Sequence, residues 1–292
     1  LKMRRLGKGA LFKAVYEGKE VAITKNAFRS YEFDVKKFLK KGINELIVEI
    51  EPIYQKWQAV NSDEFNILHS EKRAVFRKAA FQFGWDWAPR QLAGEISFPV
   101  YLTFEDKKEY LRFASVQTEA ISEEMANMLL TIKTEFLKDE KYNLKLSYST
   151  SDNKTTTLDL GDLSLENSKD NISLFRFNVE NPQLWFPNGY GNPTLYEATI
   201  YLYNKESICL DSVKTRFGIR TIELSQKKDK YGSEFCFIVN GKPIFAKGAN
   251  LVPSAMHKER YEGMAKHIDL VKECNMNMLR VWGGGYYVDE QM

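Results

Sequence analysis

Two tryptophans flank an aspartate in the segment 83–90, which reads FGWDWAPR. On an extended strand, Trp85 and Trp87 would point to one face and Asp86 to the other. A buried aspartate needs hydrogen-bond donors, because a carboxylate is costly to remove from water. A sugar ring supplies them, since its hydroxyl groups donate to the carboxylate and its C–H face lies flat on an indole. The alternative interpretation is that both tryptophans belong to the core and Asp86 caps a turn.

A second group of candidate residues lies near the end of the chain. Arg280 and Trp282 are expected at the carboxyl end of a buried strand, and the glycines 283–285 that follow let other backbone approach closely. Asn250 is expected just past the end of the preceding strand. In a (β/α)₈ barrel, this rim carries the functional residues. The alternatives are a salt bridge for Arg280 and a simple turn role for Asn250.

The elements that must position these residues are mainly short β-strands. Strands are expected at 12–16 and 21–23, joined by a turn at Gly18, and again at 46–50 and 98–104, with one or two helical turns in 33–40. This pattern indicates an antiparallel sandwich. The Trp-Asp-Trp segment precedes its closing strand.

A second all-β region is expected from about residue 111 to 218. Strands at 129–134, 144–148 and 195–203 favour a sandwich of immunoglobulin size. The segment 149–171 is rich in Ser, Thr, Asn and Asp and is expected to be a solvated loop. The insert 181–191 reads NPQLWFPNGYG, and its aromatic residues are expected to lock a domain corner.

The pattern changes again after residue 235. A hairpin with Asn240-Gly241 at its tip is followed by a strand end, a helix at 257–274 and a strand at 276–282. This order predicts a β-α-β unit with parallel strands. Two parallel strands leave unpaired edges, so the chain is expected to be part of a longer protein.

Composition excludes several classes of protein. A chain of 292 residues with 43% hydrophobic residues can bury about two cores. The net charge is only +3, so no nucleic-acid partner is expected. No apolar run approaches the roughly 20 residues of a membrane helix, so no membrane partner is expected either.

The cysteines have no metal-ligand spacing to one another or to a histidine, so neither a metal nor another cofactor is expected. Cys209, Cys236 and Cys274 are all expected to be buried thiols. Asn153 and Asn171 begin two N-x-[ST] triplets, which makes them candidate N-glycosylation sites if the protein is secreted or lysosomal.

The order of these motifs resembles the β-mannosidases of glycoside hydrolase family 2. The resemblance rests on FGWDW, the insert 181–191, KGAN at 247–250 and NMLRVWGGG at 277–285, and it extends from about Leu6 to Asp289. It implies a multidomain, mainly β fold. A jelly-roll sugar-binding domain lacking its first strands would occupy 1–108, an immunoglobulin-like sandwich 109–220, and the first two β/α units of a TIM barrel 221–292.

The resemblance also implies roles for individual residues. Asp86, with Trp85 beside it, would grip hydroxyl groups of the terminal mannose of a β-mannoside substrate. Trp282 would form part of the aromatic wall of the sugar pocket, and Asn250 would lie on its rim. Arg280 would support the nucleophile carboxylate, since a guanidinium keeps a neighbouring carboxylate ionised.

The implied reaction is retaining hydrolysis by two glutamates roughly 5 Å apart, one the nucleophile and the other the acid/base. Both are expected after Met292, so this chain alone would be inactive. Glu262 and Glu273 fall on the expected helix and Glu234 in a hairpin, and none of them is assigned either role.

Two departures from the family pattern bear on loop geometry. Ala88 stands where the family usually has glycine, and Ala255 stands near the place of an aspartate. Two alternatives remain: another family 2 enzyme, acting on galactosides or glucuronides, or a non-catalytic lectin-like protein. Oligomeric state and compartment are left open.

Overall fold

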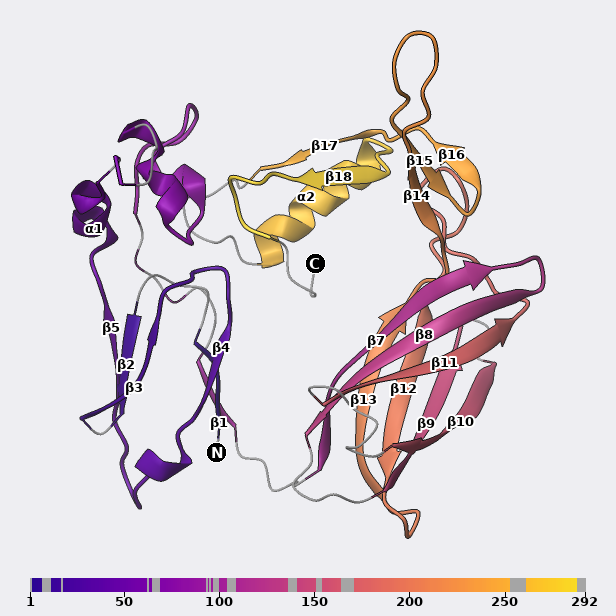
Figure 1. Ribbon diagram of the computed structural model, residues 1–292, viewed down its shortest axis with the longest axis horizontal. Coiled ribbons are helices and arrows are strands. Elements are labelled where there is room, and N and C mark those ends of the chain that lie inside the picture. The colour runs from indigo at the N-terminus through magenta and orange to yellow at the C-terminus, as the bar shows by residue number, and fades with distance from the viewer. Residues whose placement is uncertain are drawn as a thin grey trace. The chain divides into compact units, whose positions relative to one another are not determined.

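The computed structural model describes residues 2–6, 12–16, 18–61, 63–64, 69–92, 94, 96, 100–103, 109–135, 141–150, 154–163, 171–252 and 261–287. The chain forms two compact units, and most of its elements are strands (Figure 1). The first unit comprises 1–105, 248–273 and 279–292, and the second comprises 106–247 and 274–278. The domain boundaries expected at 108 and 220 remain a prediction.

The amino-terminal part of the first unit consists of two three-stranded antiparallel sheets, with strand orders β4-β1-β6 and β3-β2-β5. Their strands are β1 (Lys2–Leu6), β2 (Phe12–Tyr16), β3 (Lys19–Thr24), β4 (Tyr31–Asp34), β5 (Leu46–Ile50) and β6 (Tyr101–Thr103). Gly18 turns between β2 and β3 at φ +73°, as predicted. Ala14 and Val35 are fully buried at the centre of this part.

Helical turns fill the chain between β5 and β6. They are α1 (Ile53–Ala59) and the 3₁₀ turns η2 (His69–Val75) and η3 (Ala80–Phe83). The expected helical turns at 33–40 reduce to one 3₁₀ turn, η1 (Lys36–Phe38), because the residues before it form β4. In the described residues of the segment before Trp-Asp-Trp, the elements are these three short helical ones.

The first unit also contains most of a β-α-β unit made of β17 (Gly248–Leu251), α2 (Tyr261–Glu273) and β18 (Met278–Val281). The Asn277 N–H donates to the Lys247 carbonyl at 2.9 Å, and the Trp282 N–H donates to the Leu251 carbonyl at 3.2 Å. Because the partner numbers rise together, the two strands run parallel, as the sequence predicts.

The second unit is a sandwich of a four-stranded sheet, β10-β9-β12-β13, and a three-stranded sheet, β11-β8-β7 (Figure 1). Its strands are β7 (Tyr110–Ile121), β8 (Met125–Glu135), β9 (Tyr142–Ser149), β10 (Thr155–Leu163), β11 (Ile172–Glu180), β12 (Tyr196–Tyr203) and β13 (Cys209–Phe217). Every second residue of β9 is buried, which gives the half-buried alternation of a sandwich strand. The fully buried core side chains include Met128, Leu130, Ile132, Leu144, Leu146, Leu163, Ile200 and Leu202.

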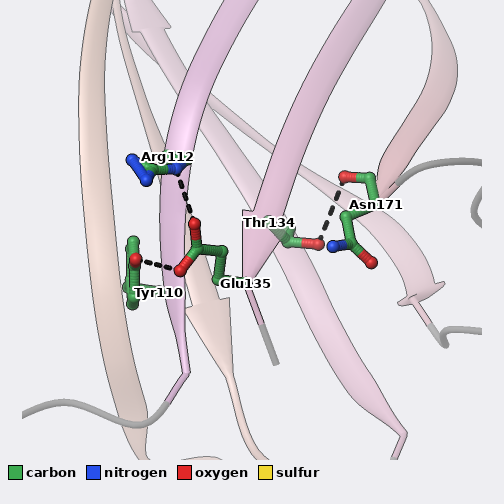
Figure 2. Close-up of polar contacts among 5 residues, drawn as sticks. All are labelled: Tyr110, Arg112, Thr134, Glu135 and Asn171. Atoms are coloured by element: carbon green, nitrogen blue, oxygen red, sulfur yellow. Dashed lines mark hydrogen bonds and ion pairs between the residues drawn. The ribbon is translucent and has the colours of Figure 1, made fainter. Parts of the chain in front are cut away.

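Polar contacts tie strand ends together at one end of the three-stranded sheet (Figure 2). The Glu135 carboxylate accepts a hydrogen bond from the Tyr110 hydroxyl and pairs with the Arg112 guanidinium at 2.7 Å. Beside it, the Thr134 N–H donates to the Asn171 carbonyl at 2.9 Å. Asn171 has φ +61°, a left-handed turn conformation that asparagine tolerates, and it leads directly into β11.

Two expectations about this unit were wrong. β10 occupies much of the segment 149–171, which was expected to be a loop; an edge strand with one face in water accepts a polar composition. Cys209 and Cys274 are exposed and Cys236 is only half-buried, because Cys209 begins an edge strand and Cys274 lies in the turn after α2. Both sequons stay predictions, and Asn153 lies outside the described residues.

The chain between the sandwich and β17 forms a small antiparallel sheet of β14 (Ile222–Ser225), β15 (Cys236–Val239) and β16 (Lys242–Ile244). Asn240 and Gly241 join β15 to β16 with φ values of +50° and +74°, which confirms the predicted hairpin. No helix in the described part of the chain is both long enough and apolar enough to cross a membrane.

Candidate functional site

The Trp-Asp-Trp segment is a closed turn, not the strand that alternation suggested. The Trp85 N–H donates to the Ala88 carbonyl at 2.9 Å, and the Ala88 N–H returns a bond to the Trp85 carbonyl at 3.3 Å. Asp86 and Trp87 therefore form the tip of the turn, and both are exposed. Gly84 precedes the turn at φ +104°, a backbone conformation that favours glycine and that breaks any strand leading into it.

The turn rests on an aromatic cluster that brings distant segments of the first unit together. The Trp282 ring lies 5.1 Å from Trp85 at 77° and 6.0 Å from Trp87 at 60°, centroid to centroid. Phe81, which is fully buried, stacks on Trp87 at 5.5 Å and meets Tyr286 edge-on at 5.7 Å. Such tilted and edge-to-face pairs are favourable arrangements of aromatic rings.

Hydrogen bonds join the same two segments beneath the rings. The Phe81 N–H donates to the Gly284 carbonyl at 3.2 Å, and the Gln82 side-chain amide donates to the Tyr286 hydroxyl at 2.6 Å. Gly284 is buried, and a Cβ there would lie 2.8 Å from Cε2 of Trp282 and closer still to two other ring atoms. Only glycine therefore lets the chain pass under the indole.

Arg280 and Asn250 meet on the neighbouring strands β18 and β17. The Arg280 guanidinium donates to the Asn250 side-chain oxygen at 3.0 Å, and both residues are exposed. Asn250 lies within β17 rather than just past it, because the strand extends to Leu251. Within the described residues, no carboxylate pairs with Arg280, so the expected alternative of a rim salt bridge is not observed.

These residues present binding groups rather than a complete set of reacting groups. The turn carries the exposed Asp86 carboxylate and two indoles. β18 carries the exposed Arg280 guanidinium, and the third indole, Trp282, lies just after this strand. Glu262 and Glu273 lie on α2, and Glu234 accepts a hydrogen bond from the Ser225 hydroxyl in the second unit. Across the described ranges, no three His, Cys, Asp or Glu side chains gather closely enough to hold a metal ion.

Sequence reasoning missed several supporting residues. Phe81 lies two positions before the FGWDWAPR motif, and Tyr286 directly follows the NMLRVWGGG motif. Their closeness to these motifs in the sequence could have marked them as candidates. Arg73 had no such signal: its guanidinium lies 4.2 Å from the Trp85 ring centroid, although twelve positions of sequence separate them. Arg90 lies similarly over Trp57 of α1, at 4.6 Å.

Two family models match the chain in succession. Residues 12–94 match the glycosyl hydrolase 2 galactose-binding domain-like model, and residues 110–220 match glycosyl hydrolases family 2. The chain belongs to glycosyl hydrolase family 2. The aromatic turn thus lies within the first matched region of a family 2 protein, and Arg280 and Trp282 lie after the second.

Proteins named β-mannosidase B resemble the chain over most of its length. It is 30% identical over 294 residues to β-mannosidase B of Aspergillus flavus, covering 94% of this chain and 33% of that protein. It is 33% identical over 239 residues to β-mannosidase B of Aspergillus fumigatus, covering 80% and 26%. The chain therefore spans about a third of the length of the curated relatives it matches.

Solved structures agree with this family placement. The crystal structure of β-D-mannosidase from Dictyoglomus thermophilum matches 99% of this chain and 36% of that one, with TM-score 0.84 and 29% identity. A β-glucuronidase from Bacteroides uniformis matches with TM-score 0.64 at 18% identity, which indicates a shared fold alone. The chain is thus a mainly β part of a family 2 protein.

Proposed function

We propose that this chain is the amino-terminal part of a retaining exo-β-mannosidase, which removes terminal non-reducing β-D-mannose from β-mannosides. The relatives named β-mannosidase B, and the D. thermophilum enzyme at 29% identity, support this substrate over the sugars of more distant family members. In this proposal the paired sheets of β1–β6 are a sugar-binding jelly roll and the second unit is an immunoglobulin-like sandwich. The β17-α2-β18 unit begins a TIM barrel.

The observation that carries the proposal is the contact of the Asp86 turn with Trp282. Both neighbours of Asp86 in the turn pack on the Trp282 ring, and Asp86 itself is exposed between them in the sequence. A sugar needs this combination, because its hydroxyl groups donate to a carboxylate while its C–H face packs on an indole. Asp86 would hold mannose hydroxyls, with Trp85 and Trp282 as the apolar wall.

Arg280 would act on the nucleophile rather than on the sugar. Its bond to Asn250 uses one guanidinium nitrogen and leaves other N–H donors exposed toward solvent. A guanidinium fork favours the ionised form of a carboxylate beside it, which is the form that attacks the anomeric carbon. The nucleophile and acid/base glutamates, roughly 5 Å apart, would come from the part of the polypeptide that follows Met292.

The experiment that tests this is kinetics of the complete polypeptide on nitrophenyl β-glycosides. We expect β-D-mannoside to be the preferred substrate over β-galactoside and β-glucuronide. Asp86→Ala should lower kcat/KM by about two to four orders of magnitude, because hydroxyl contacts tighten in the transition state.

Asp162→Ala is a matched control, since Asp162 is an exposed aspartate on β10 of the second unit. It should leave kcat/KM unchanged. Preference for a galactoside or glucuronide would reject the mannosidase proposal in favour of another family 2 enzyme. Hydrolysis of mannoside with Asp86→Ala as active as the parent would remove Asp86 from the sugar site.

A further inference from the structure

We infer that Arg73 is a positioning residue for the sugar site, holding the root of the turn that carries Asp86. The inference rests on the proposed function and adds a residue to that site. Arg73 lies in η2 and is partly buried. It meets the turn at two places: its guanidinium lies over the Trp85 ring at 4.2 Å, and its Nη1 donates to the Gly84 carbonyl at 3.4 Å.

Gly84 is the place where the turn needs such support. Glycine populates a wide range of backbone angles, and Gly84 adopts φ +104°. Its N–H donates to the Phe81 carbonyl at 3.0 Å, and its own carbonyl accepts from Arg73. With both polar groups of the residue engaged, the direction in which the chain enters the turn is restricted. Asp86 follows only two residues later.

The ring of Trp85 passes this restraint on to the rest of the site. Trp85 contacts Arg73 through its ring face and Trp282 through an edge-to-face pair. Its backbone closes the turn through two hydrogen bonds with Ala88. A change in the Trp85 ring position would therefore move both the aromatic wall and the tip. Arg73 would act on the sugar through Trp85 and Gly84.

Arginine suits this position better than lysine. A planar guanidinium can stack on an indole and still donate a hydrogen bond in its own plane, whereas an ammonium is a strongly hydrated point charge. Lysine would keep the charge and lose one of the two contacts. The conservative substitution should accordingly recover only part of the function.

The test is a double-mutant cycle in the complete enzyme, measured as kcat/KM on nitrophenyl β-D-mannoside. Arg73→Ala should lower kcat/KM about tenfold to thirtyfold, mainly by raising KM, and Arg73→Lys should recover part of the loss. In the Asp86→Ala background, the same Arg73 substitutions should change kcat/KM severalfold less than in the parent, because the carboxylate that they position is gone and only the aromatic wall remains to be displaced.

A matched control is available in the second unit. Arg220 is exposed and lies over the Trp185 ring at the same 4.2 Å, so Arg220→Ala removes the same kind of contact elsewhere. Its kcat/KM should stay within about twofold of the parent. If Arg73→Ala does not fold, the double-mutant cycle is measured with Arg73→Lys alone.

The outcomes separate this inference from the proposed function. If Asp86→Ala has no effect on mannoside hydrolysis, the proposed site fails, and the role of Arg73 fails with it. If Asp86→Ala has its full effect while the Arg73 variants have none, only the positioning role is overturned. The positioning role would also be overturned if the Arg73 substitution lowered kcat/KM by the same factor in the parent and in Asp86→Ala. That is the result expected of a purely structural role. The criterion applies to Arg73→Ala, or to Arg73→Lys if only that variant folds.

Discussion

Trp85 and Trp185 each have an arginine guanidinium 4.2 Å from the ring centroid, yet their surroundings differ. Around Trp185, in the second unit, the backbone is fully engaged by neighbours. The Trp185 N–H donates to the Ile219 carbonyl at 2.9 Å, and its carbonyl accepts from the Asn240 side-chain amide at 2.9 Å. We call this region the Trp185 corner: its bonds tie the 181–191 insert to Ile219 and Asn240, and the role of the insert in locking a domain corner stays a prediction.

Around Trp85 the backbone is also closed, but the tip is left open to solvent. Asp86 is exposed, and the Trp87 side chain is 45% exposed although it stacks on Phe81. A large exposed indole beside an exposed carboxylate stabilises a fold poorly and suits a ligand well. The difference teaches that the same arginine–tryptophan contact serves packing in one region and presentation of a polar group in the other.

Among substitutions that leave the Asp86 carboxylate in place, the largest expected effect comes from Gly284→Ala, which should lower kcat/KM of the complete enzyme about 100-fold. The added methyl group would overlap the Trp282 ring, and that ring cannot swing freely because Trp85, Trp87 and Phe81 pack against it. The indole and the turn above it would have to move. Steady-state kinetics on a β-mannoside, together with the melting temperature, measure the effect.

Gly218→Ala is the matched variant in the Trp185 corner. A Cβ at Gly218 would lie 3.1 Å from Cβ and Cγ of Trp185, atoms too near the backbone to move aside. We expect a loss of about 1–3 kcal/mol in the free energy of unfolding with kcat/KM unchanged. Loss of activity in Gly218→Ala, or unchanged activity in Gly284→Ala, would erase the functional difference between the two regions.

The two tryptophan regions also show what sequence reasoning could reach. The Asn240-Gly241 hairpin and most strands follow from local pattern and turn chemistry, and so did the choice of Asp86, Trp282, Arg280 and Asn250 as candidates. The closed turn at Trp85–Ala88 could not be predicted in this way. The alternation of residue types indicates which face of a strand a side chain points to, and it gives no information on the backbone hydrogen bonds between Trp85 and Ala88. The contact between Trp85 and Trp282 joins distant segments of the chain, and only tertiary folding determines it.

Ala88→Gly should have a moderate effect on stability. Ala88 is 6% exposed and belongs to the buried cluster with Ala79 and Phe81. Its backbone φ is not positive, so alanine fits the turn without strain. Removing the methyl group costs burial and adds unfolded-state freedom, together about 1–2 kcal/mol of unfolding free energy. Urea unfolding measures the change.

This substitution also tests an expected departure from the family, because the resemblance to the β-mannosidases predicts glycine at the position of Ala88. If the methyl group is packed as described, the departure stabilises the turn rather than distorting it. A more stable Ala88→Gly variant would indicate that the methyl group strains the turn. Strain in this turn would then be a further difference between it and the Trp185 corner.

The smallest effect should come from pH, and it concerns a carboxylate of the second unit whose hydrogen bonds are made within the fold. Asp159 on β10 accepts hydrogen bonds from the Asn143 side chain and from the Gly161 N–H, each at 2.9 Å. The Asn143 bond, followed by the Gly161 bond, lowers the pKa of Asp159 below its ordinary value of 3.8.

A lowered pKa means that the unfolded chain binds the proton more readily than the folded one. The stabilisation from Asp159 is therefore present above its ordinary pKa and is lost as the pH falls through the lower, folded-state pKa. Asp159→Asn removes this proton linkage, so the melting temperature of the variant should fall less steeply with acid. An acid dependence of melting in Asp159→Asn that equals the parent's would mean that these two bonds do not hold the carboxylate ionised in solution.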